Sequence, residues 1–549
     1  MVSWNNQWRE SIWAHIGEPW DIVVIGGGIT GAGILREATR RGLRTLLVEQ
    51  RDFGWGTSSR SSKLVHGGLR YLKEGKIILT QASVRERNRL LKEGGGLVTS
   101  LGFLLATYKG KYPGKWTYGV GLSIYDLLAL QWNHTYHSAV DFQMLAPRIT
   151  RERLEGGFRF ADAQTDDARL VLRVIKEAVA AGGFAMNYIR AEELIRDGDD
   201  VKGIRLIDVV NNRRADVYAK CFINATGVWS DNLRKQVDAE PHIRPLRGSH
   251  LIFPAWRVPV AQAVSFPHPV DNRPVFIIPW EGITLVGTTD IDHDRPLQEE
   301  PSITPEETAY LMSAVESEFP SLHITLDDII STFAGIRPVI DTKKVGPSKA
   351  SREHVVWEEK GLLTVTGGKL TTFRLIALDA LKASRHRLPS MIPVKRNGRM
   401  FDNVNVIIPP NIRLDESQKV RLLGRYGNGA LAVISSAREG ELEPIPGTPY
   451  IWAELRYAAR SEGVVHLDDL LLRRVRLGLL LPKGGESLLP KIREITEAEL
   501  DWNDVRWEAE ETAYKTLWKQ CYSLPDRKTI PEWRNKTAGL KVNNSMSTH

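Results

Sequence analysis

The most regular pattern of apolar and polar positions lies between residues 21 and 49. Four consecutive apolar residues, 22–25, predict a buried strand, and they run into a glycine-rich turn. The periodic apolar positions that follow the glycines predict a helix, and the apolar run at 45–48 predicts a second strand. This order of strand, turn, helix and strand is typical of the start of a nucleotide-binding α/β domain.

The glycines of the turn have the spacing that dinucleotide sites need. Gly26 allows the tight turn, Gly28 lets the backbone approach a pyrophosphate, and Gly31 lets helix and strand pack closely. The pyrophosphate would lie at the helix N-terminus, where free N–H groups favour negative charge. Glu49 closes the second strand, where a carboxylate can bind ribose hydroxyls and disfavours the 2′-phosphate of NADP. The segment therefore predicts a site for FAD or NAD.

Residues 51–71 are rich in small, hydroxyl and cationic side chains and follow directly on Glu49. We interpret them as a loop and helix start that runs along the cofactor; a solvated loop is the alternative, since serine-rich turns are common. The hydroxyl residues available to the cofactor phosphates and ring are Thr57, Ser58, Ser59 and Ser62. The residues expected at the reactive end are His66, Gly67, Gly68, Arg70 and Tyr71.

Two later segments also place glycines at the end of an apolar strand, as the first turn does. The apolar run 221–227 ends in Ala-Thr-Gly, and Gly227 permits close approach of a bound nucleotide. Residues 362–378 form a strand, two glycines and an amphipathic helix whose N-terminus faces a polar or anionic group. This second turn supplies Gly368, Lys369 and Thr371.

The pattern changes twice further along the chain. Residues 159–165 read as a loop before a helix that begins at Asp166 or Asp167. Between 245 and 365 strand-like runs recur, which predicts an antiparallel sheet inserted into the nucleotide domain, with runs at 249–254, 263–267, 274–280, 283–290, 328–340 and 354–359. Beyond about 395 the periodicity is helical, at 414–425, 449–462, 466–480 and 496–520.

Charge and cysteine content limit the partners. A net charge of +8 and a pI near 9.2 suggest an acidic ligand or an anionic surface, but no basic block interleaved with aromatics indicates nucleic acid. Only two cysteines are present, which fits a reducing cytoplasmic compartment, and we predict no metal site. The N-terminal repeat of Trp4, Trp8 and Ile12 predicts either a helix packed on the protein's own surface or one lying on lipid.

A resemblance emerges from these motifs in order. In chain order the motifs are GGGITGAG, TSSRSSKLVHGGLRYL, TDDARLV, NATGVWSD, RGSHLI, IIPW with VGTTD, AGIRP and TGGKLTTFR, followed by DDLLLRR in the helical tail. Together they resemble the FAD-dependent glycerol-3-phosphate dehydrogenases. The resemblance implies an α/β (α+β) fold, with a Rossmann-like FAD-binding domain, an inserted antiparallel-sheet substrate domain and a helical C-terminal cap domain. The implied boundaries are 1–75, 161–244 and 361–394 for the FAD-binding domain, 76–160 and 245–360 for the substrate domain, and 395–549 for the cap domain.

The family's reaction, as the resemblance implies, is oxidation of sn-glycerol 3-phosphate to dihydroxyacetone phosphate, with hydride passing from C2 to flavin N5. Such a site needs a base and cations. His250 is the candidate base and His66 its rival, since either histidine can titrate near neutral pH. Arg337 can bind hydroxyl or phosphate oxygens, while Arg70, Tyr71 and Lys369 are further substrate contacts.

The electrons would pass to a quinone, and an oxidase that uses oxygen is the alternative. An amino-acid oxidase-like enzyme and a non-enzymatic FAD-binding scaffold are the remaining readings. The pI and the tryptophan-rich N-terminus further predict peripheral contact of a cytoplasmic protein with the inner face of the cell membrane. The sequence leaves open whether the protein forms a homo-oligomer.

Overall fold

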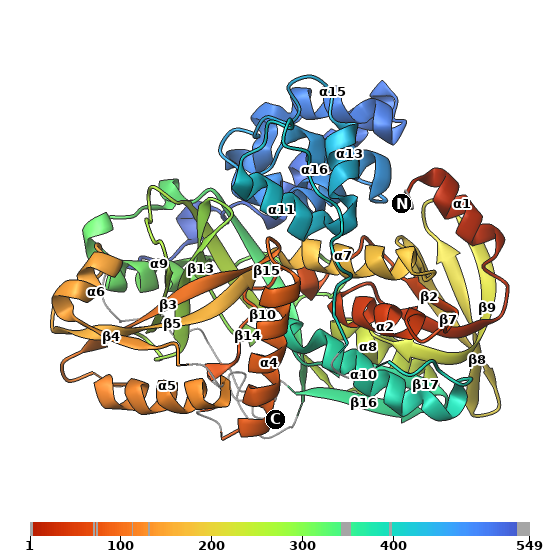
Figure 1. The fold of residues 1–549 in the computed structure, drawn as a ribbon, viewed down its shortest axis with the longest axis horizontal. Coiled ribbons are helices and arrows are strands. Elements are labelled where there is room, and N and C mark those ends of the chain that lie inside the picture. Colours follow the sequence, from red (N-terminus) through yellow and green to blue (C-terminus); the bar gives the residue numbers. More distant parts are fainter. Residues whose placement is uncertain are drawn as a thin grey trace.

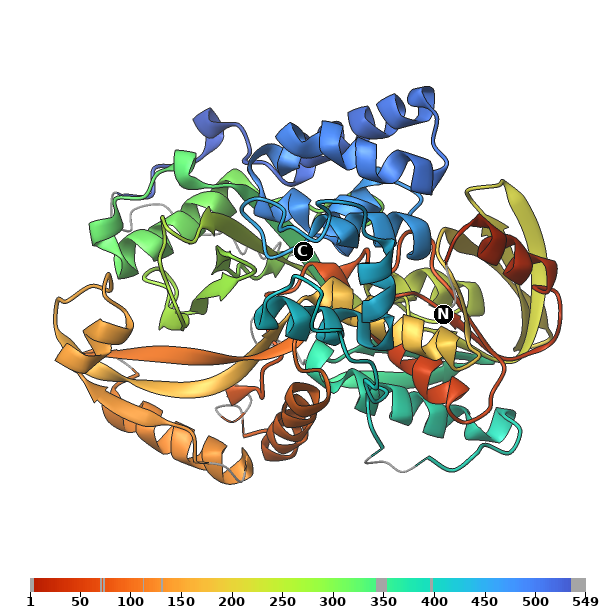
Figure 2. The same ribbon diagram turned by 45° about the horizontal axis from the view of Figure 1, so that its top comes forward.

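The computed structural model describes residues 4–69, 72, 75–111, 113–129, 132–341, 353–394 and 398–534. Two lobes, each built on a sheet, lie side by side, and a helical unit formed by the C-terminal part of the chain lies across them (Figures 1 and 2). The predicted combination of a nucleotide-type sheet, a second sheet and a helical C-terminal part is confirmed.

The first sheet contains the predicted strand–glycine–helix unit. Its inner strands run parallel and follow the order β16-β17-β9-β1-β2-β6, and a hairpin of β7 and β8 extends from β9. The strands are β1 (Trp20–Ile25), β2 (Thr45–Val48), β6 (Phe184–Met186), β7 (Ile189–Asp197), β8 (Asp200–Asp208), β9 (Arg213–Asn224), β16 (His354–Glu359) and β17 (Leu362–Gly367).

Both faces of this sheet are covered, which explains why its strands read as continuous apolar runs. Ile22 and Val24 of β1 pack against α2 (Ile29–Thr39), α7 (Asp167–Ala180) and α10 (Phe373–Ala383). Val23 and Ile25 point to the other face, toward α1 (Asn6–Ala14) and the β7–β8 hairpin. Asp166 accepts a hydrogen bond from the backbone N–H of Arg169 and caps α7, as the sequence predicted.

The second sheet is antiparallel apart from the β11–β3 pair. Its order is β14-β10-β13-β12-β11-β3-β5-β4, with β15 on the other side of β10. The strands are β3 (Val98–Tyr108), β4 (Thr135–Ser138), β5 (Leu154–Thr165), β10 (Ile243–Pro254), β11 (Ala263–Pro267), β12 (Pro274–Trp280), β13 (Ile283–Gly287), β14 (Ile291–Asp292) and β15 (Ser331–Ile340).

Helices cover this sheet on both faces. α5 (Lys115–Ala129) and the C-terminal helices share one apolar cluster on the sheet, and α9 (Pro305–Glu318) packs on the opposite face. The shorter α6 (Ala139–Leu145) and α8 (Ser230–Arg234) join strands, and α4 (Ile77–Glu93) lies between the lobes (Figure 1).

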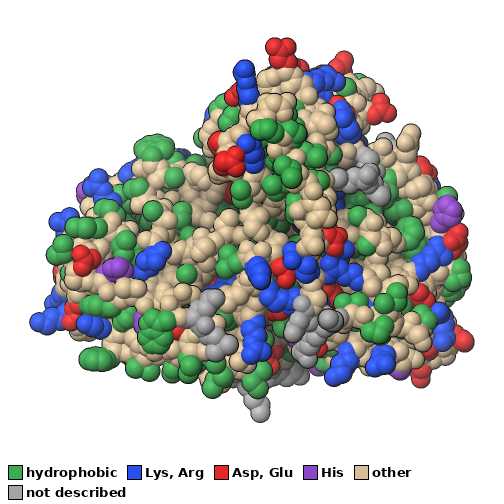
Figure 3. Space-filling model, viewed as in Figure 1, with side chains coloured by type: hydrophobic (Ala, Val, Ile, Leu, Met, Phe, Trp, Pro, Cys, Tyr) green, Lys and Arg blue, Asp and Glu red, His purple; other side chains and the backbone are tan. Residues whose placement is uncertain are grey.

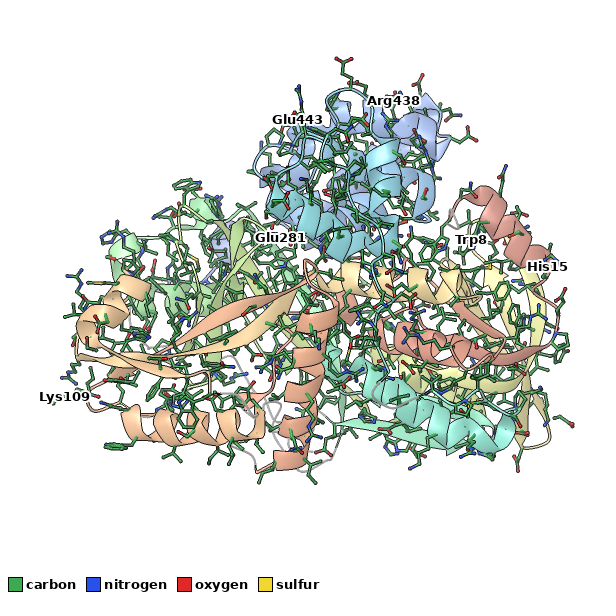
Figure 4. All side chains as sticks on the ribbon, viewed as in Figure 1. Trp8, His15, Lys109, Glu281, Arg438 and Glu443 are labelled. Atoms are coloured by element: carbon green, nitrogen blue, oxygen red, sulfur yellow. The ribbon has the colours of Figure 1, made fainter. Side chains whose placement is uncertain are left out.

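The C-terminal unit is helical, as its periodicity predicted. Its helices are α11 (Glu416–Tyr426), α12 (Ala430–Ser436), α13 (Trp452–Ser461), the π-helix η10 (Asp469–Arg474), α14 (Leu477–Leu480), α15 (Leu489–Leu500) and α16 (Asp504–Cys521). Its α11 reaches down to the second sheet, where Arg421 binds Glu281 in the β12–β13 turn at 2.7 Å (Figure 4).

Three sequence interpretations need correction. The sequence pattern places residues 354–359 in the inserted sheet, but β16 forms a hairpin with β17 and so belongs to the first sheet. The sequence pattern predicts a loop at 159–165, but these residues are the second half of β5, and the pattern does not predict its partner β3. β3 and β5 pair along their whole length, so long-range pairing overrides the weak local strand signal of their glycines and polar residues.

The N-terminal helix packs on the protein itself. Trp4, Ile12 and Ile16 are buried, and Trp4 stacks on Trp8 and contacts Phe53. Figure 4 shows Trp8 and His15 on α1 at the edge of the first lobe. The packing interpretation of this segment, and not the lipid-lying one, therefore accounts for its buried apolar residues.

Candidate cofactor and active site

The predicted glycines of the first turn fill places where no side chain fits. Gly26 has a φ of +114°, and a Cβ atom there would lie 2.5 Å from the carbonyl oxygen of Ala225. A Cβ atom on Gly31 would lie 1.9 Å from the carbonyl oxygen of Gly26. Gly28 caps the N-terminus of α2 without a side-chain hydrogen bond, so this helix start presents backbone N–H groups. The turn has the shape that the glycine spacing predicted.

A cleft of about 420 Å³ opens where the parallel strands of the first sheet end. Ligands of open α/β sheets bind at the carboxyl ends of such strands. The cleft contacts the predicted residues Gly26, Gly28, Glu49, Thr57, Ser58, Gly227, Gly368 and Lys369. Of the other predicted cofactor residues, Gly31, Ser62 and Thr371 do not line it. The predicted substrate contacts Arg70 and Tyr71 lie outside the described residues.

Glu49 is held by the backbone at the end of β2. Its carboxylate accepts hydrogen bonds from the N–H groups of Gly27, at 2.7 Å, and Arg51, at 2.9 Å. Burial raises the pKa of this carboxyl, although both N–H groups oppose that shift. A carboxylate has about four acceptor positions, so two remain for a ligand in the cleft.

The 52–63 segment connects the cleft with the second sheet. Ser58 Oγ accepts a hydrogen bond from the N–H of Ile29 in α2, at 2.9 Å, and Thr57 donates to the carbonyl of Ile336 in β15, at 2.5 Å. Trp55 and Trp229 also line the cleft, with ring centres 5.7 Å apart. The sequence analysis missed these two tryptophans, although each lies two residues from a predicted site residue.

His250 is buried on β10 beside this segment. Its Nε2 is 2.9 Å from Ser62 Oγ, its ring stacks on Phe333 with centres 4.5 Å apart, and its Nδ1 has no hydrogen-bond partner among the described residues. Burial, followed by the positive charges of Arg337 and Lys63, lowers the pKa of His250 well below 6.5. The imidazole is therefore neutral at physiological pH. Ser62, predicted for the cofactor, also contacts the candidate base.

Arg337 extends from β15 toward the end of β13. Its guanidinium donates to Asp290, at 3.1 Å, and to Thr288, at 3.4 Å, and the side chain keeps 27% exposure. Glycines make room for the side chains of Arg337 and His250. A Cβ atom on Gly248 would lie 2.9 Å from the Arg337 guanidinium, and a Cβ atom on Gly287 would lie 2.2 Å from the His250 ring.

The second glycine-rich turn approaches the same region from the first sheet. Gly368 has a φ of +73°, and Lys369 and Leu370 line the cleft beside it. Thr371 donates to the carbonyl of His66, at 3.2 Å, which ties the candidate histidine loop to this turn. Segments far apart in the chain thus supply the candidate histidines His66 and His250, the candidate cations Arg337 and Lys369, and the residues that line the cleft.

These residues fit a flavin dinucleotide. The glycines leave a side-chain-free cradle at a helix N-terminus, a partly buried carboxylate closes the second strand, and Ser61, which lines the cleft, directly precedes Ser62, which contacts His250. This geometry is that of a flavoprotein oxidoreductase in which the nucleotide-binding sheet lies beside a second, largely antiparallel sheet.

Comparisons with known proteins agree with this class. The family model described as FAD dependent oxidoreductase matches residues 21–374, and that of the C-terminal domain of alpha-glycerophosphate oxidase matches 395–507. Aerobic glycerol-3-phosphate dehydrogenase of Staphylococcus aureus (strain USA300) is 36% identical, over 83% of this chain and 86% of that protein. The chain belongs to the FAD-dependent glycerol-3-phosphate dehydrogenase family.

Solved structures extend the comparison to the fold. The glycerol-3-phosphate dehydrogenase from Bacillus halodurans, solved in complex with FAD, is 28% identical with a TM-score of 0.73, covering 95% of this chain and 98% of that chain. An L-alpha-glycerophosphate oxidase from Mycoplasma pneumoniae with FAD bound is 17% identical with a TM-score of 0.57, covering 71% and 100%, and shows a shared fold.

Proposed function

We propose that the protein oxidises sn-glycerol 3-phosphate to dihydroxyacetone phosphate and passes the electrons to a quinone. The observation that carries this proposal is a neutral buried histidine, bound to Ser62 next to the cleft-lining Ser61 and close to the cation Arg337, in a chain of this family. FAD, when bound, supplies the acceptor for the hydride that leaves C2. The protein must then bind the substrate, take up the hydroxyl proton and exclude water.

His250 is the proposed base. Because its pKa is lowered, the ring is unprotonated at neutral pH and can accept the proton of the C2 hydroxyl. Nδ1 is the nitrogen with no described partner, and Nε2 is held by Ser62, which fixes the ring orientation. His66 remains the alternative base, on the loop anchored by Thr371.

Arg337 and Lys369 are the proposed cations. The guanidinium of Arg337 would stabilise negative charge that develops on the C2 oxygen as its proton leaves. Lys369, at the rim of the cleft, would bind the substrate phosphate or the cofactor. Arg70 and Tyr71 stay predicted substrate contacts. The cofactor roles also stay predictions for Gly26, Gly28, Gly31, Glu49, Thr57, Ser58, Ser62, Gly227, Gly368 and Thr371.

Anaerobic titration of the purified protein with glycerol 3-phosphate tests the reaction. Bleaching of the flavin absorption, with one dihydroxyacetone phosphate formed per flavin, is the expected result. A flavin that stays oxidised would contradict the proposal. Acid precipitation should release the flavin into the supernatant, because we expect noncovalent binding.

The electron acceptor is decided by the second half of the same experiment. The C-terminal family match names an alpha-glycerophosphate oxidase, which keeps oxygen as a second candidate acceptor. We expect the reduced protein to be reoxidised faster by a soluble quinone analogue than by air-saturated buffer. The reverse order of rates would make the protein an oxidase.

We also propose that the protein binds membranes peripherally, through α5 and not through the N-terminal helix. Among the described residues, no helix is long and apolar enough to cross a bilayer. The outer face of α5 exposes an apolar stripe at helical spacing, with Trp116 83%, Val120 60%, Ile124 42% and Leu127 69% exposed.

The surroundings of this stripe suit an anionic lipid surface. α4 packs beside α5 and exposes Ile77 and Ile78, and Trp132 follows α5 with 71% exposure. Lys109, Lys111 and Lys115 are exposed near the start of the helix. Figure 3 shows hydrophobic side chains along the lower left edge, where Figure 1 places α5, and Figure 4 labels Lys109 there. Tryptophan and lysine around an apolar stripe are typical of interfacial helices.

A further inference from the structure

Buried cations of the C-terminal unit bind the 52–63 segment. Both oxygens of Asp52 are held by Arg474, at 2.6 and 2.7 Å, and one of them also by Arg473, at 2.5 Å. Arg476 donates to the carbonyl oxygen of Ser59 at 2.8 Å. These three arginines, which we call the arginine cluster, lie in or directly after η10.

The contacts of the arginine cluster are sealed from water. Asp52, Arg474 and Arg476 have no exposed side-chain surface, and Arg473 has 1%. Burial alone would raise the pKa of Asp52, but the charges of Arg474 and Arg473 outweigh it and lower that pKa. Breaking one partner of such a pair leaves an unpaired buried charge, which is strongly unfavourable.

The bound segment is the part of the chain that shapes the cleft. Trp55, Thr57 and Ser58 line it, and Ser58 also binds the N-terminus of α2. At its far end Ser62 holds the ring of His250. Lys63 donates to the carbonyl of Ser59, the same oxygen that Arg476 binds, so both ends of the segment depend on one buried network.

We propose that the arginine cluster is a positioning element for the flavin site, through which the C-terminal unit holds the 52–63 segment in its FAD-binding conformation. The inference rests on the proposed function only in taking the cleft as the FAD site. It assigns the C-terminal unit a role in cofactor affinity. Arg473, Arg474 and Arg476 act through Asp52 and Ser59 and do not line the cleft themselves.

Arg474→Lys tests the proposal in the full-length holoenzyme. Lysine keeps the charge but presents a single nitrogen in place of the two guanidinium nitrogens that bind the two oxygens of Asp52. We expect the dissociation constant of FAD, measured by recovery of flavin fluorescence on dilution, to rise about tenfold or more, because one charge-assisted hydrogen bond is lost. Amides of residues 52–63 should also exchange faster with deuterium. Asp52→Asn, which removes the charge at nearly constant volume, should act in the same direction.

Arg456→Lys is the matched control. Arg456 is equally buried and binds both oxygens of Glu441, at 2.5 and 2.7 Å, but this pair lies wholly within the C-terminal unit. We expect the control to lower the melting temperature and to leave the FAD dissociation constant within about twofold of wild type. A control that weakens FAD as much as Arg474→Lys, or an Arg474→Lys protein with unchanged FAD affinity, overturns the proposal.

Native-state hydrogen exchange of the unmodified holoenzyme gives a test that does not depend on any variant. If the cluster holds the segment, residues 52–63 and 469–476 open together and share one denaturant dependence. Independent opening of the two segments would refute the coupling. A wild-type protein that binds no FAD would instead defeat the proposed function, so the two failures are distinguishable.

Discussion

At the scale of single residues, the site depends on one histidine that burial keeps neutral. His250 lies between Phe333 and Ser62, and the nearby positive charges of Arg337 and Lys63 add to the effect of burial on its pKa. The sequence could nominate this histidine through its motif. It could not show that the side chain is enclosed, because the enclosing residues come from three strands and a loop.

His250→Asn should lower kcat/KM by about 10²- to 10⁴-fold if this residue is the base. The wild-type enzyme should lose activity only on acidification well below pH 6.5, since a lowered pKa keeps the ring unprotonated down to that point. The variant should lose this acid limb. His268→Asn is the control, because His268 is also buried in the second lobe but binds the carbonyl of Tyr310. If His250→Asn is silent, His66 becomes the better candidate for the base.

Arg337→Ala should act mainly on kcat. An interaction that strengthens as charge develops on the C2 oxygen contributes about 3–4 kcal/mol, which corresponds to roughly 10²- to 10³-fold in rate. Steady-state kinetics combined with rapid-mixing measurement of flavin reduction separates kcat from KM. Arg244→Ala, which removes a partly exposed arginine paired with Asp292, is the control. A change below about threefold at Arg337 would place the reacting centre elsewhere.

At the scale of elements, the turn between β1 and α2 is tightly constrained by its glycines. Gly31→Ala forces a methyl group against the Gly26 carbonyl, 1.9 Å away, so helix and strand must separate. We expect the variant to be isolated with little FAD and a lower melting temperature. Gly121→Ala in α5, where nothing lies within 4 Å of the added Cβ atom, should fold and retain flavin. Normal flavin content in Gly31→Ala would contradict the packing role assigned to this glycine.

The α5 stripe makes a separate prediction about elements. Trp116→Ser with Leu127→Ser should reduce flotation with anionic liposomes at low salt, because buried apolar area drives interfacial binding. High salt should weaken binding of the wild type, since charge attraction is screened. Trp256→Ser, at an equally exposed tryptophan outside α5, should bind as the wild type does. Equal flotation of both variants would remove α5 as the contact surface.

At the scale of the whole molecule, buried carboxylate–arginine pairs join the C-terminal unit to the first lobe. Glu462 binds Arg169 of α7 through both oxygens, at 2.6 and 2.9 Å. Burial opposes ionisation, but Arg169 outweighs it and lowers the pKa of Glu462 from 4.5 to about 2. Figure 1 places the C-terminal helices directly above α7, and this pair joins the two parts.

Acid should therefore destabilise the molecule. A carboxyl whose folded pKa is lowered stabilises the fold above its unfolded pKa and loses that contribution as pH falls through the folded value. For Glu462 the window runs from about pH 4.5 to 2, and its full contribution is roughly 3 kcal/mol. Melting temperature against pH should fall steeply there, and Glu462→Gln should be less stable at pH 7 with a shallower slope. The exposed Glu439→Gln should reproduce the wild-type curve.

The sequence alone determined the parts of this protein whose physics is local. A strand, three glycines, a helix and an acid lie within thirty residues, so their spacing predicts the nucleotide turn, and the capping aspartate of α7 and the helical C-terminal part follow in the same way. The motifs, taken in their order along the chain, then predicted the protein family and the cofactor FAD, and the comparisons support both predictions.

Only the tertiary structure decided which surfaces meet. It placed β16 beside β17, paired β3 with β5, buried Trp4 directly before α1, exposed Trp116 of α5, and brought Arg474 onto Asp52. Both tryptophan-bearing helices have the same kind of apolar stripe in the sequence. Which stripe finds a partner depends on contacts between residues hundreds of positions apart, and a local pattern carries no information about those contacts.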